Sequence, residues 1–455
     1  MAIVTVNPAT GKHLQRYREL TATQVDAVLT QATTAFVSWR RTPLATRARH
    51  LRAVARELRK RQFDFASLIT AEMGKPIAQA LAEVQKCALN CEFYAANATC
   101  FLADERPEGA PRHRYVTYQP LGPVLAIMPW NFPFWQVFRG AAPALMAGNT
   151  MVLKHASNVT GCALALQQIF ECAGVPRGVF QTAVVNAARA EKMVSDERIA
   201  MITLTGSTAV GRKVAALAGA AMKRGVYELG GSDAYVILAD ADLARAAELC
   251  AESRLYNGGQ SCVAAKRFIV VAKVRARFEK LFIAKLAERR SGDPLDATTQ
   301  LGPLARASVR DELHEQVQRS VRQGARLLLG GKMPAGPGCY YPATVLADVR
   351  PGMAACDEEL FGPVAAIMPA KNQADALRLA NLTSYGLGAA VFTSDKARGE
   401  KIARDELHVG NAFVNEFVRS HATLPFGGVK CSGHGRELGA WGIREFTNTK
   451  VISVS

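Results

Sequence analysis

Several features that define other protein classes are missing from this 455-residue sequence. No Cys-x-x-Cys pair or Cys/His quartet occurs among its ten cysteines, which argues against a zinc site or a disulfide framework. No apolar run approaches the roughly 20 residues that cross a bilayer. The first residues carry no charged segment leading into an apolar stretch, so we expect no secretory signal and a cytoplasmic protein with reduced thiols.

Acidic residues are too few to balance Lys and Arg, and the formal net charge is +17. One interpretation is a nucleic-acid-binding protein, because basic patches displace counterions from phosphate backbones. The basic residues are spread along the chain, however, and clusters such as Arg59-Lys60-Arg61 are short and lack interleaved aromatics. A basic, solvated surface is the simpler interpretation, and it would also steer an anionic substrate or cofactor. We expect neither nucleic acid nor a membrane as a partner.

The apolar pattern divides the chain into a helical N-terminal part and two α/β parts. Between residues 22 and 105, apolar residues recur at spacings of three and four, which predicts helices. Beyond residue 115, β-rich runs alternate with helical stretches, with a change-over near Gly230-Gly231, and this order predicts parallel, doubly wound sheets. The predicted strands are 124–128, 151–154, 179–185, 201–205, 235–238, 268–271, 326–329, 364–368 and 389–392.

Segments 114–119 and 450–455 alternate like exposed strands, yet neither has an evident partner in its own domain. Edge strands of this kind often pair between subunits, so an oligomer is expected.

Two turns carry candidate reactive groups. In Asn257-Gly-Gly-Gln-Ser-Cys262, a thiol follows a Gly-rich turn, where it can be exposed at a cleft. Its ordinary pKa of about 8.5 means that modest help makes it a nucleophilic thiolate. In Glu228-Leu-Gly-Gly-Ser-Asp233, a carboxylate leads into a Gly-Gly turn and can serve as a general base. Each has an ordinary alternative, because a cysteine is commonly a small buried hydrophobe and a glutamate can simply end a strand.

Two other turns follow predicted strands at their carboxyl ends, where α/β proteins bind ligands. In Pro129-Trp-Asn-Phe-Pro133, the Asn131 amide can donate to an oxyanion, although an ordinary turn with a packed Trp is the alternative. Thr205-Gly-Ser-Thr-Ala-Val-Gly211 leads into a predicted helix whose N-terminus suits a pyrophosphate. It matches neither G-x-G-x-x-G nor a P-loop, because Arg212 stands where a P-loop has Lys.

These four motifs together resemble the aldehyde dehydrogenase superfamily, and the resemblance runs nearly end to end. Seven motifs in the family's order and spacing leave little room for chance. The other three are Lys154-His-Ala-Ser157, Glu358-Glu-Leu-Phe-Gly-Pro-Val364 and Pro425-Phe-Gly-Gly-Val-Lys-Cys-Ser-Gly-His-Gly-Arg436. Within the superfamily, Ile127–Pro133, Glu228–Asp233 and Ala264–Phe268 resemble bacterial succinate semialdehyde dehydrogenases.

The resemblance implies an α/β fold in three parts. Residues 1–105 and 121–230 would form a Rossmann-like cofactor domain, and residues 231–445 an α/β catalytic domain. Residues 106–120 and 446–455 would form a small β oligomerisation flap. The resemblance further implies NAD or NADP as cofactor, a small anionic aldehyde as substrate, a homodimer or homotetramer, and no metal.

It also implies roles for individual residues. Cys262 would attack the aldehyde carbon, while the Asn131 amide and the Cys262 backbone N–H hold the alkoxide. After hydride has passed to the nicotinamide, Glu228 would activate water to hydrolyse the thioester. Glu359 would hold the nicotinamide ribose beside Phe361, and Lys154 the adenine ribose. Trp130, Gly206 and Ser207 would line the cofactor path.

Two positions bear on the choice of cofactor. Relatives that prefer NAD often carry a glutamate at the position of Ser157, and its charge repels a 2′-phosphate. Serine removes that repulsion and can donate a hydrogen bond, so NADP is expected to bind as well as NAD. His155 departs from the more usual proline.

The predicted substrate is succinate semialdehyde, with glutarate semialdehyde or another small aldehyde as the alternative. Arg139 and Ser420 match residues that bind the distal carboxylate in succinate semialdehyde dehydrogenases. Tyr256 stands where some relatives carry a second arginine, and Arg254 lies two residues before it. The alternative for Arg139 is a surface or interdomain salt bridge.

Two other kinds of relative stay in view. A coenzyme-A-acylating enzyme needs no water-activating base, so Glu228 argues against it. A non-catalytic relative is disfavoured by the intact Cys262, Glu228 and Asn131.

Overall fold

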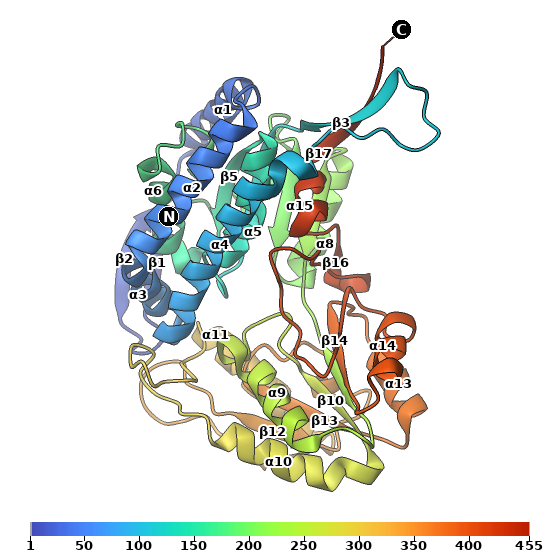
Figure 1. Cartoon of the computed structure of the whole chain (residues 1–455). Coiled ribbons are helices and arrows are strands. Elements are labelled where there is room, and N and C mark those ends of the chain that lie inside the picture. Colours follow the sequence, from blue (N-terminus) through green and yellow to red (C-terminus); the bar gives the residue numbers. More distant parts are fainter. Residues whose placement is uncertain (1, 455) are drawn as a thin grey trace.

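The computed structural model of the protein describes residues 2–454, and two sheets with their covering helices lie one above the other in Figure 1. The chain begins with an antiparallel hairpin of β1 (Ala2–Val6) and β2 (His13–Arg18). The helical N-terminal part is confirmed. It consists of α1 (Ala22–Trp39), α2 (Leu44–Lys60), α3 (Gln62–Met73) and α4 (Ile77–Phe101).

The first sheet has six strands in the order β16-β8-β7-β4-β5-β6, and every neighbouring pair is parallel except β16 with β8. Its strands are β4 (Pro123–Met128), β5 (Thr150–His155), β6 (Phe180–Thr182), β7 (Met201–Thr205), β8 (Arg224–Glu228) and β16 (Gly433–His434). The helices between them are α5 (Trp135–Ala147), α6 (Thr160–Cys172), α7 (Ala187–Ser195) and α8 (Thr208–Ala220).

The second sheet has seven strands in the order β11-β12-β13-β10-β9-β14-β15, and only β11 runs antiparallel to its neighbour. Its strands are β9 (Ala234–Ile237), β10 (Arg267–Val271), β11 (Arg326–Leu329), β12 (Thr344–Ala347), β13 (Val364–Ala370), β14 (Gly388–Phe392) and β15 (Asn411–Val414). Its helices are α9 (Leu243–Leu255), α10 (Arg275–Ala287), α11 (Ala307–Arg322), α12 (Ala354–Asp357), α13 (Gln373–Asn381) and α14 (Lys396–Asp405). The last helix of the chain, α15 (Gly439–Glu445), lies outside this domain. Short 3₁₀ turns span Ser157–Val159, Tyr256–Gly259, Ala272–Val274 and Lys430–Ser432. The predicted doubly wound sheets are confirmed.

The order of the first sheet creates a binding crevice. From β4 the chain moves outward to β5 and β6, and then returns to place β7 on the other side of β4. Ligands bind at such a switch point, beyond the carboxyl ends of the strands. The loops that follow β4 and β7 therefore meet at one edge of the sheet.

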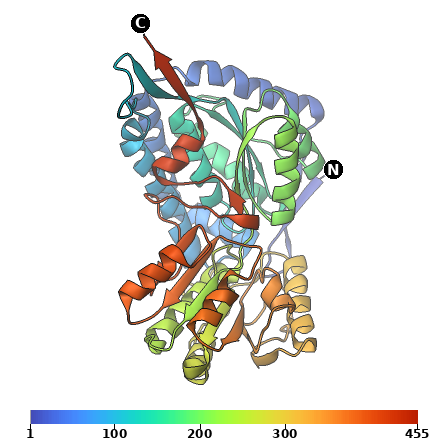
Figure 2. The same cartoon turned by 90° about the vertical axis from the view of Figure 1, so that its right-hand side faces the viewer.

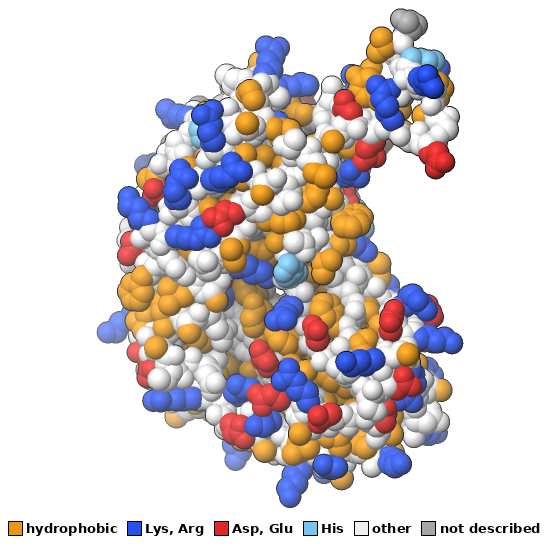
Figure 3. Space-filling model, viewed as in Figure 1, with side chains coloured by type: hydrophobic (Ala, Val, Ile, Leu, Met, Phe, Trp, Pro, Cys, Tyr) orange, Lys and Arg blue, Asp and Glu red, His pale blue; other side chains and the backbone are white. Residues whose placement is uncertain are grey.

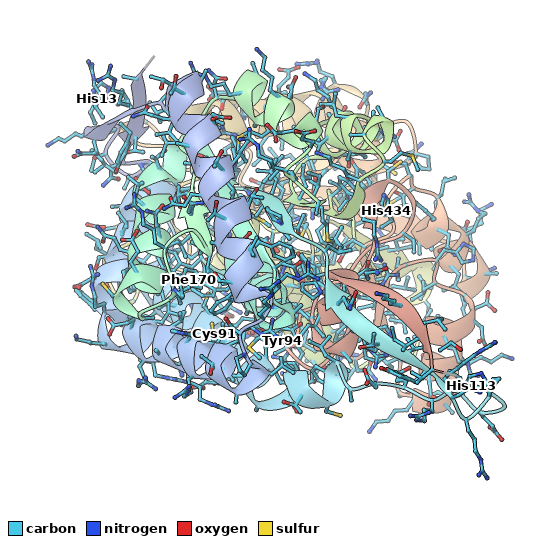
Figure 4. The ribbon with its side chains drawn as sticks, turned by 90° about the horizontal axis from the view of Figure 1, so that it is seen from above. His13, Cys91, Tyr94, His113, Phe170 and His434 are labelled. Carbon is cyan, nitrogen blue, oxygen red and sulfur yellow. The ribbon has the colours of Figure 1, made fainter. Side chains whose placement is uncertain are left out.

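A two-stranded ribbon projects from the body of the protein at the end farther from the second sheet (Figures 1 and 2). It consists of β3 (Arg114–Pro120) and β17 (Thr447–Ser453), paired antiparallel. The two predicted strands exist and pair with each other within the chain, and pairing of the ribbon with another subunit stays a prediction. Residue 455 of the predicted tail lies outside the described residues. Viewed from above, His113 marks the projecting end of the ribbon, far from His13 (Figure 4).

The C-terminal part of the chain returns to the first sheet. The predicted catalytic domain extended to residue 445, but β16 pairs with β8, and α15 packs against α4 and α5. The buried Tyr94 hydroxyl, close to Cys91 on α4 in Figure 4, donates to the Gly439 carbonyl at 3.1 Å. The chain therefore crosses between the sheets twice, and the second crossing passes near the carboxyl end of β8.

Lys and Arg side chains are dispersed over the face seen in Figure 3, among uncharged and acidic ones. Within residues 2–454, no helix combines the length and apolar character needed to cross a membrane. The same range holds no group of three or more His, Cys, Asp or Glu side chains placed to bind a metal ion.

Candidate active site

A cleft of about 630 Å³ is lined by residues from both sheets. It brings together most of the residues proposed for catalysis and cofactor binding. Those at its surface are Trp130, Asn131, Gly206, Ser207, Cys262, Glu359 and Phe361.

The candidate nucleophile lies at the end of an unusually tight turn. Asn257, Gly258 and Gly259 all have left-handed backbone angles, with φ of 55°, 63° and 75°. A Cβ atom on Gly259 would lie 2.2 Å from the Gly362 carbonyl oxygen, so only glycine fits there. Cys262 remains partly exposed to the cleft.

Burial raises the pKa of the Cys262 thiol to about 12, although the Arg139 and Lys266 charges oppose this effect. Cys262 therefore carries its proton at neutral pH, and that proton would have to leave before or during a nucleophilic attack. Lys266 also supports the turn mechanically, because its Nζ donates to the carbonyls of Ser261 at 2.9 Å and Cys262 at 2.7 Å. The buried Lys266 ammonium thus fixes the backbone of the turn that ends at Cys262.

The candidate oxyanion donor is tied to the same turn. Asn131 is 4% exposed, and its Nδ2 donates to the Gln260 carbonyl at 3.0 Å. In return, the Asn257 Nδ2 donates to the Asn131 carbonyl at 2.7 Å. An amide nitrogen has two hydrogens, so one remains for an oxyanion. These bonds join the loop after β4 to the turn before Cys262, although the two segments belong to different sheets.

The candidate base is a buried carboxyl group without a partner. Glu228 ends β8 and is 1% exposed, and within the described chain neither of its carboxyl oxygens has a hydrogen-bond partner. Burial raises the pKa of Glu228 well above its ordinary value, and the charge of Glu437 raises it further. Buried polar groups are nearly always hydrogen-bonded, and exceptions concentrate at functional sites. The role of Glu228 as the base that activates water stays a prediction.

Arg139 lies in a buried ion pair. It is 2% exposed, and its Nε is 2.5 Å from Oε2 of Glu437, without the alignment of a hydrogen bond. Its Nη2 donates to Thr205 Oγ1 at 3.3 Å, and its guanidinium lies over the ring of Phe426. The structure thus corresponds to the alternative given for Arg139, a salt-bridge residue. Its binding of the substrate carboxylate stays a prediction, since its charge is already paired.

The other candidate substrate residues occupy distinct surroundings. The Tyr256 ring lies 5.6 Å from that of Phe132 and 6.5 Å from that of Phe417. Arg254 is fully buried and donates to the Gly259 carbonyl at 2.7 Å, so it supports the nucleophile turn. Ser420 accepts a hydrogen bond from Lys86, a residue on α4.

The cofactor candidates fall into two groups. Ser207 caps α8, and its Oγ accepts from the Val210 N–H at 3.4 Å. Trp130 and Phe361 pack edge to face with centroids 5.6 Å apart. Lys154 and Ser157, at the carboxyl end of β5 and just beyond it, lie outside the set that lines the cleft.

His155, the departure from proline, has a structural role. Its Nε2 donates to the Pro133 carbonyl at 2.8 Å, while its Nδ1 accepts from the Ala156 N–H at 2.9 Å. This assignment requires a neutral ring, and burial lowers the pKa of His155 to about 4. The ring therefore fastens the loop that carries Asn131 to β5.

The cleft fits a nicotinamide dinucleotide. A capped helix N-terminus with glycine in the preceding turn suits a pyrophosphate. Glu359 offers a carboxylate for ribose hydroxyls and is itself held by the Gly231 N–H at 3.0 Å and by Lys266 at 3.5 Å. The aromatic pair Trp130 and Phe361 stands on the same cleft wall.

Sequence reasoning missed three charged residues that contact candidate site residues: Lys86 contacts Ser420, Lys266 contacts Cys262 and Glu437 contacts Arg139. A signal existed for Lys266, a lysine directly before the buried apolar strand β10. Lys86 and Glu437 gave no such signal, because each lies in an ordinary mixed-polarity stretch.

The chain was compared with known proteins. The sequence model of the aldehyde dehydrogenase family matches residues 1–452. Succinate semialdehyde dehydrogenase [NAD(P)+] Sad of Escherichia coli K12 is 46% identical over 99% of this chain and 97% of its own. A probable succinate-semialdehyde dehydrogenase [NADP(+)] of Synechocystis is 45% identical over the full length of both chains.

Solved structures give the same answer. The structure of Gox0499 has a TM-score of 0.98 at 38% identity, covering 100% of both chains. Succinic semialdehyde dehydrogenase of Streptococcus pyogenes, solved with NADP+, has a TM-score of 0.97 at 34% identity and also covers 100% of both. With a family match along almost its whole length, this chain belongs to the aldehyde dehydrogenase family.

Proposed function

We propose that the protein oxidises succinate semialdehyde to succinate with NAD or NADP as the oxidant. One observation carries the chemistry: a partly exposed thiol and an amide donor line one cleft, and a buried, unpartnered carboxyl group, Glu228, lies near enough for its charge to act on that thiol. The substrate is supported by the relatives named for this activity, at 45–46% identity over nearly the full chain.

In the first half-reaction, the Cys262 thiol releases its proton to solvent, and its sulfur attacks the aldehyde carbon, whose C=O π bond opens to give a thiohemiacetal alkoxide. The Asn131 amide and the Cys262 backbone N–H donate to the resulting alkoxide. Loss of one such donor typically costs about 2.7–4 kcal/mol of transition-state stabilisation. The bound nicotinamide supplies the hydride acceptor, and the acyl group is left as a thioester on Cys262.

In the second half-reaction, Glu228 removes a proton from water, which attacks the thioester carbonyl. The carbon–sulfur bond breaks, succinate leaves and Cys262 recovers its thiol. Asn131 serves again as the oxyanion donor. Glu228 favours water as the acyl acceptor and argues against a coenzyme-A-acylating enzyme.

Both cofactors are expected to bind. Ser157 is exposed and carries no charge that would repel a 2′-phosphate, and Lys154 adds a cation on the adjoining strand. A homo-oligomer is part of the proposal, because within residues 2–454 β17 pairs on only one side and presents a free edge, while the other edge of β3 is bridged at Val116 by Glu105.

A panel of aldehydes assayed with both cofactors, by absorbance of the reduced nicotinamide, tests the proposal. Succinate semialdehyde should give the highest kcat/KM, with glutarate semialdehyde within about 200-fold, because one methylene is worth about 1–3 kcal/mol. Cys262→Ala should abolish oxidation while still binding cofactor. Substantial turnover by that variant would refute the covalent mechanism.

A further inference from the structure

Lys86 is fixed close to the oxyanion loop. It lies three residues after Glu83 on α4, and Glu83 accepts from the backbone N–H groups of Phe134 at 2.9 Å and Trp135 at 3.0 Å. These groups belong to the N-terminus of α5, which follows the Asn131 loop directly. The buried Glu83 carboxylate thus fixes the part of α4 that carries Lys86 relative to the Asn131 loop.

The Lys86 ammonium points at Ser420. Its Nζ donates to Ser420 Oγ at 2.8 Å and to the Ser420 carbonyl at 3.1 Å, and it lies 4.1 Å from the centroid of the Trp135 ring. An ammonium has three donor hydrogens, so one remains. The Ser420 hydroxyl accepts from Lys86, which leaves its own hydrogen free to donate. Two donors are thus available side by side.

Among the described residues, Lys86 has no ion-pair partner, and it shares this with the exposed Arg419 but not with two other cationic neighbours. Lys75 pairs with Glu83, and Arg139 pairs with Glu437. Among residues 2–454, no acidic group lies within ion-pair distance of Lys86, and the charges of Arg139 and Arg419 act on it as well. Burial and Arg139 lower the pKa of Lys86 to about 8, so it remains mostly protonated at neutral pH. A partly buried cation without a partner is unfavourable unless an anion joins it.

Apolar side chains connect this cation with the reaction centre. Trp135, under the ammonium, begins α5, and Phe132 lies beside the Tyr256 ring. Tyr256 in turn lies beside Phe417, whose ring is covered by Arg419. The carbon chain of a short aldehyde suits such surroundings, and its charged end needs a cation there.

We propose that Lys86, together with the Ser420 hydroxyl, binds the distal carboxylate of the substrate, an inference that rests on the proposed function. The Lys86 ammonium and the Ser420 hydroxyl each donate one hydrogen bond to the carboxylate, which completes the missing ion pair. Glu437 neutralises Arg139, and Arg419 is exposed to solvent, so Lys86 supplies the partly buried, unpaired positive charge. Selection of an anionic aldehyde over an uncharged one depends on this residue.

The test compares succinate semialdehyde with butanal, an uncharged aldehyde of equal chain length. The quantity measured is the ratio of their kcat/KM values. Lys86→Met keeps the length of the side chain and removes the charge, and should lower this ratio about 10- to 100-fold, mainly through KM for the anionic substrate. Lys86→Arg should retain most of the ratio, and Gln85→Met, a neighbour on the same helix, should leave it unchanged.

The possible results separate the two claims. If the native enzyme shows no preference for succinate semialdehyde over butanal, the proposed substrate is wrong. If that preference exists and Lys86→Met preserves it, or loses activity equally on both aldehydes, Lys86 does not bind the carboxylate. Should Lys86→Met fail to fold, Lys86→Gln carries the same comparison, with thermal unfolding and cofactor binding as checks of integrity.

Discussion

Removing the Arg139 cation is expected to destabilise the protein and to leave less of the proposed base, Glu228, ionised at neutral pH. The side chains of Arg139 and Glu437 are 3% and 1% exposed, so Arg139→Ala strands a buried carboxylate. Breaking a buried pair in this way typically costs about 3–5 kcal/mol. It also removes the positive charge that lowers the pKa of Glu228, so the base stays protonated to higher pH and thioester hydrolysis slows at neutral pH.

The assay combines unfolding with kinetics. For a domain of about 200 residues, the loss corresponds to a fall in Tm of the order of 10 °C at a fixed scan rate. The double variant Arg139→Met/Glu437→Leu should recover most of that fall, because apolar replacements of a buried pair are often neutral. Equal loss of kcat/KM on succinate semialdehyde and butanal would make Arg139 structural only. A normal Tm in Arg139→Ala would refute the buried pair.

Three further outcomes follow from the site and the ribbon. Glu228→Gln should show a burst of reduced cofactor before a slow steady state. In the native enzyme, hydrolysis should slow as pH falls, because the raised pKa of Glu228 keeps the base protonated; full steady-state activity of the variant would exclude this role. Ser157→Glu should weaken NADP binding at least about tenfold, roughly 1.4 kcal/mol, while NAD binding changes little, as measured by titration. Light scattering at micromolar concentration should give at least a dimer, and a monomer would contradict the role of the β3–β17 ribbon.

Periodicity was a sufficient guide to most of the sheet strands. Runs such as 124–128 and 201–205 are almost wholly buried, so they are rich in apolar residues, with threonine as the only polar type, and were predicted closely. The strand β8 was missed, because it begins with exposed Arg224 and Gly225 and ends in Glu228. The return of β16 to the first sheet was also missed, since two residues carry no periodicity.

The site divides in the same way. Residues whose chemistry is visible in a motif, such as Cys262 and Asn131, line the cleft as predicted. The pairing of charges was not predictable, because a sequence does not show which cation meets which anion. Arg139 matched a substrate ligand by position, yet Glu437, almost 300 residues later, lies against it. The hydrogen bonds of Lys86 with Ser420 likewise span 334 positions in the chain.

Glu437 acts on two residues at once: it pairs with Arg139, a candidate for binding the substrate, and by repulsion it raises the pKa of Glu228, the proposed base. To bind the substrate carboxylate, Arg139 would have to release Glu437. The unpaired charge of Glu437 would then raise the pKa of Glu228 further, and Glu228 would stay protonated. An unpaired cation that is not among the charges acting on the pKa of Glu228 avoids this conflict. Lys86 meets that requirement, because it can bind the distal carboxylate while Arg139 continues to balance the carboxyl groups beside the reacting thioester.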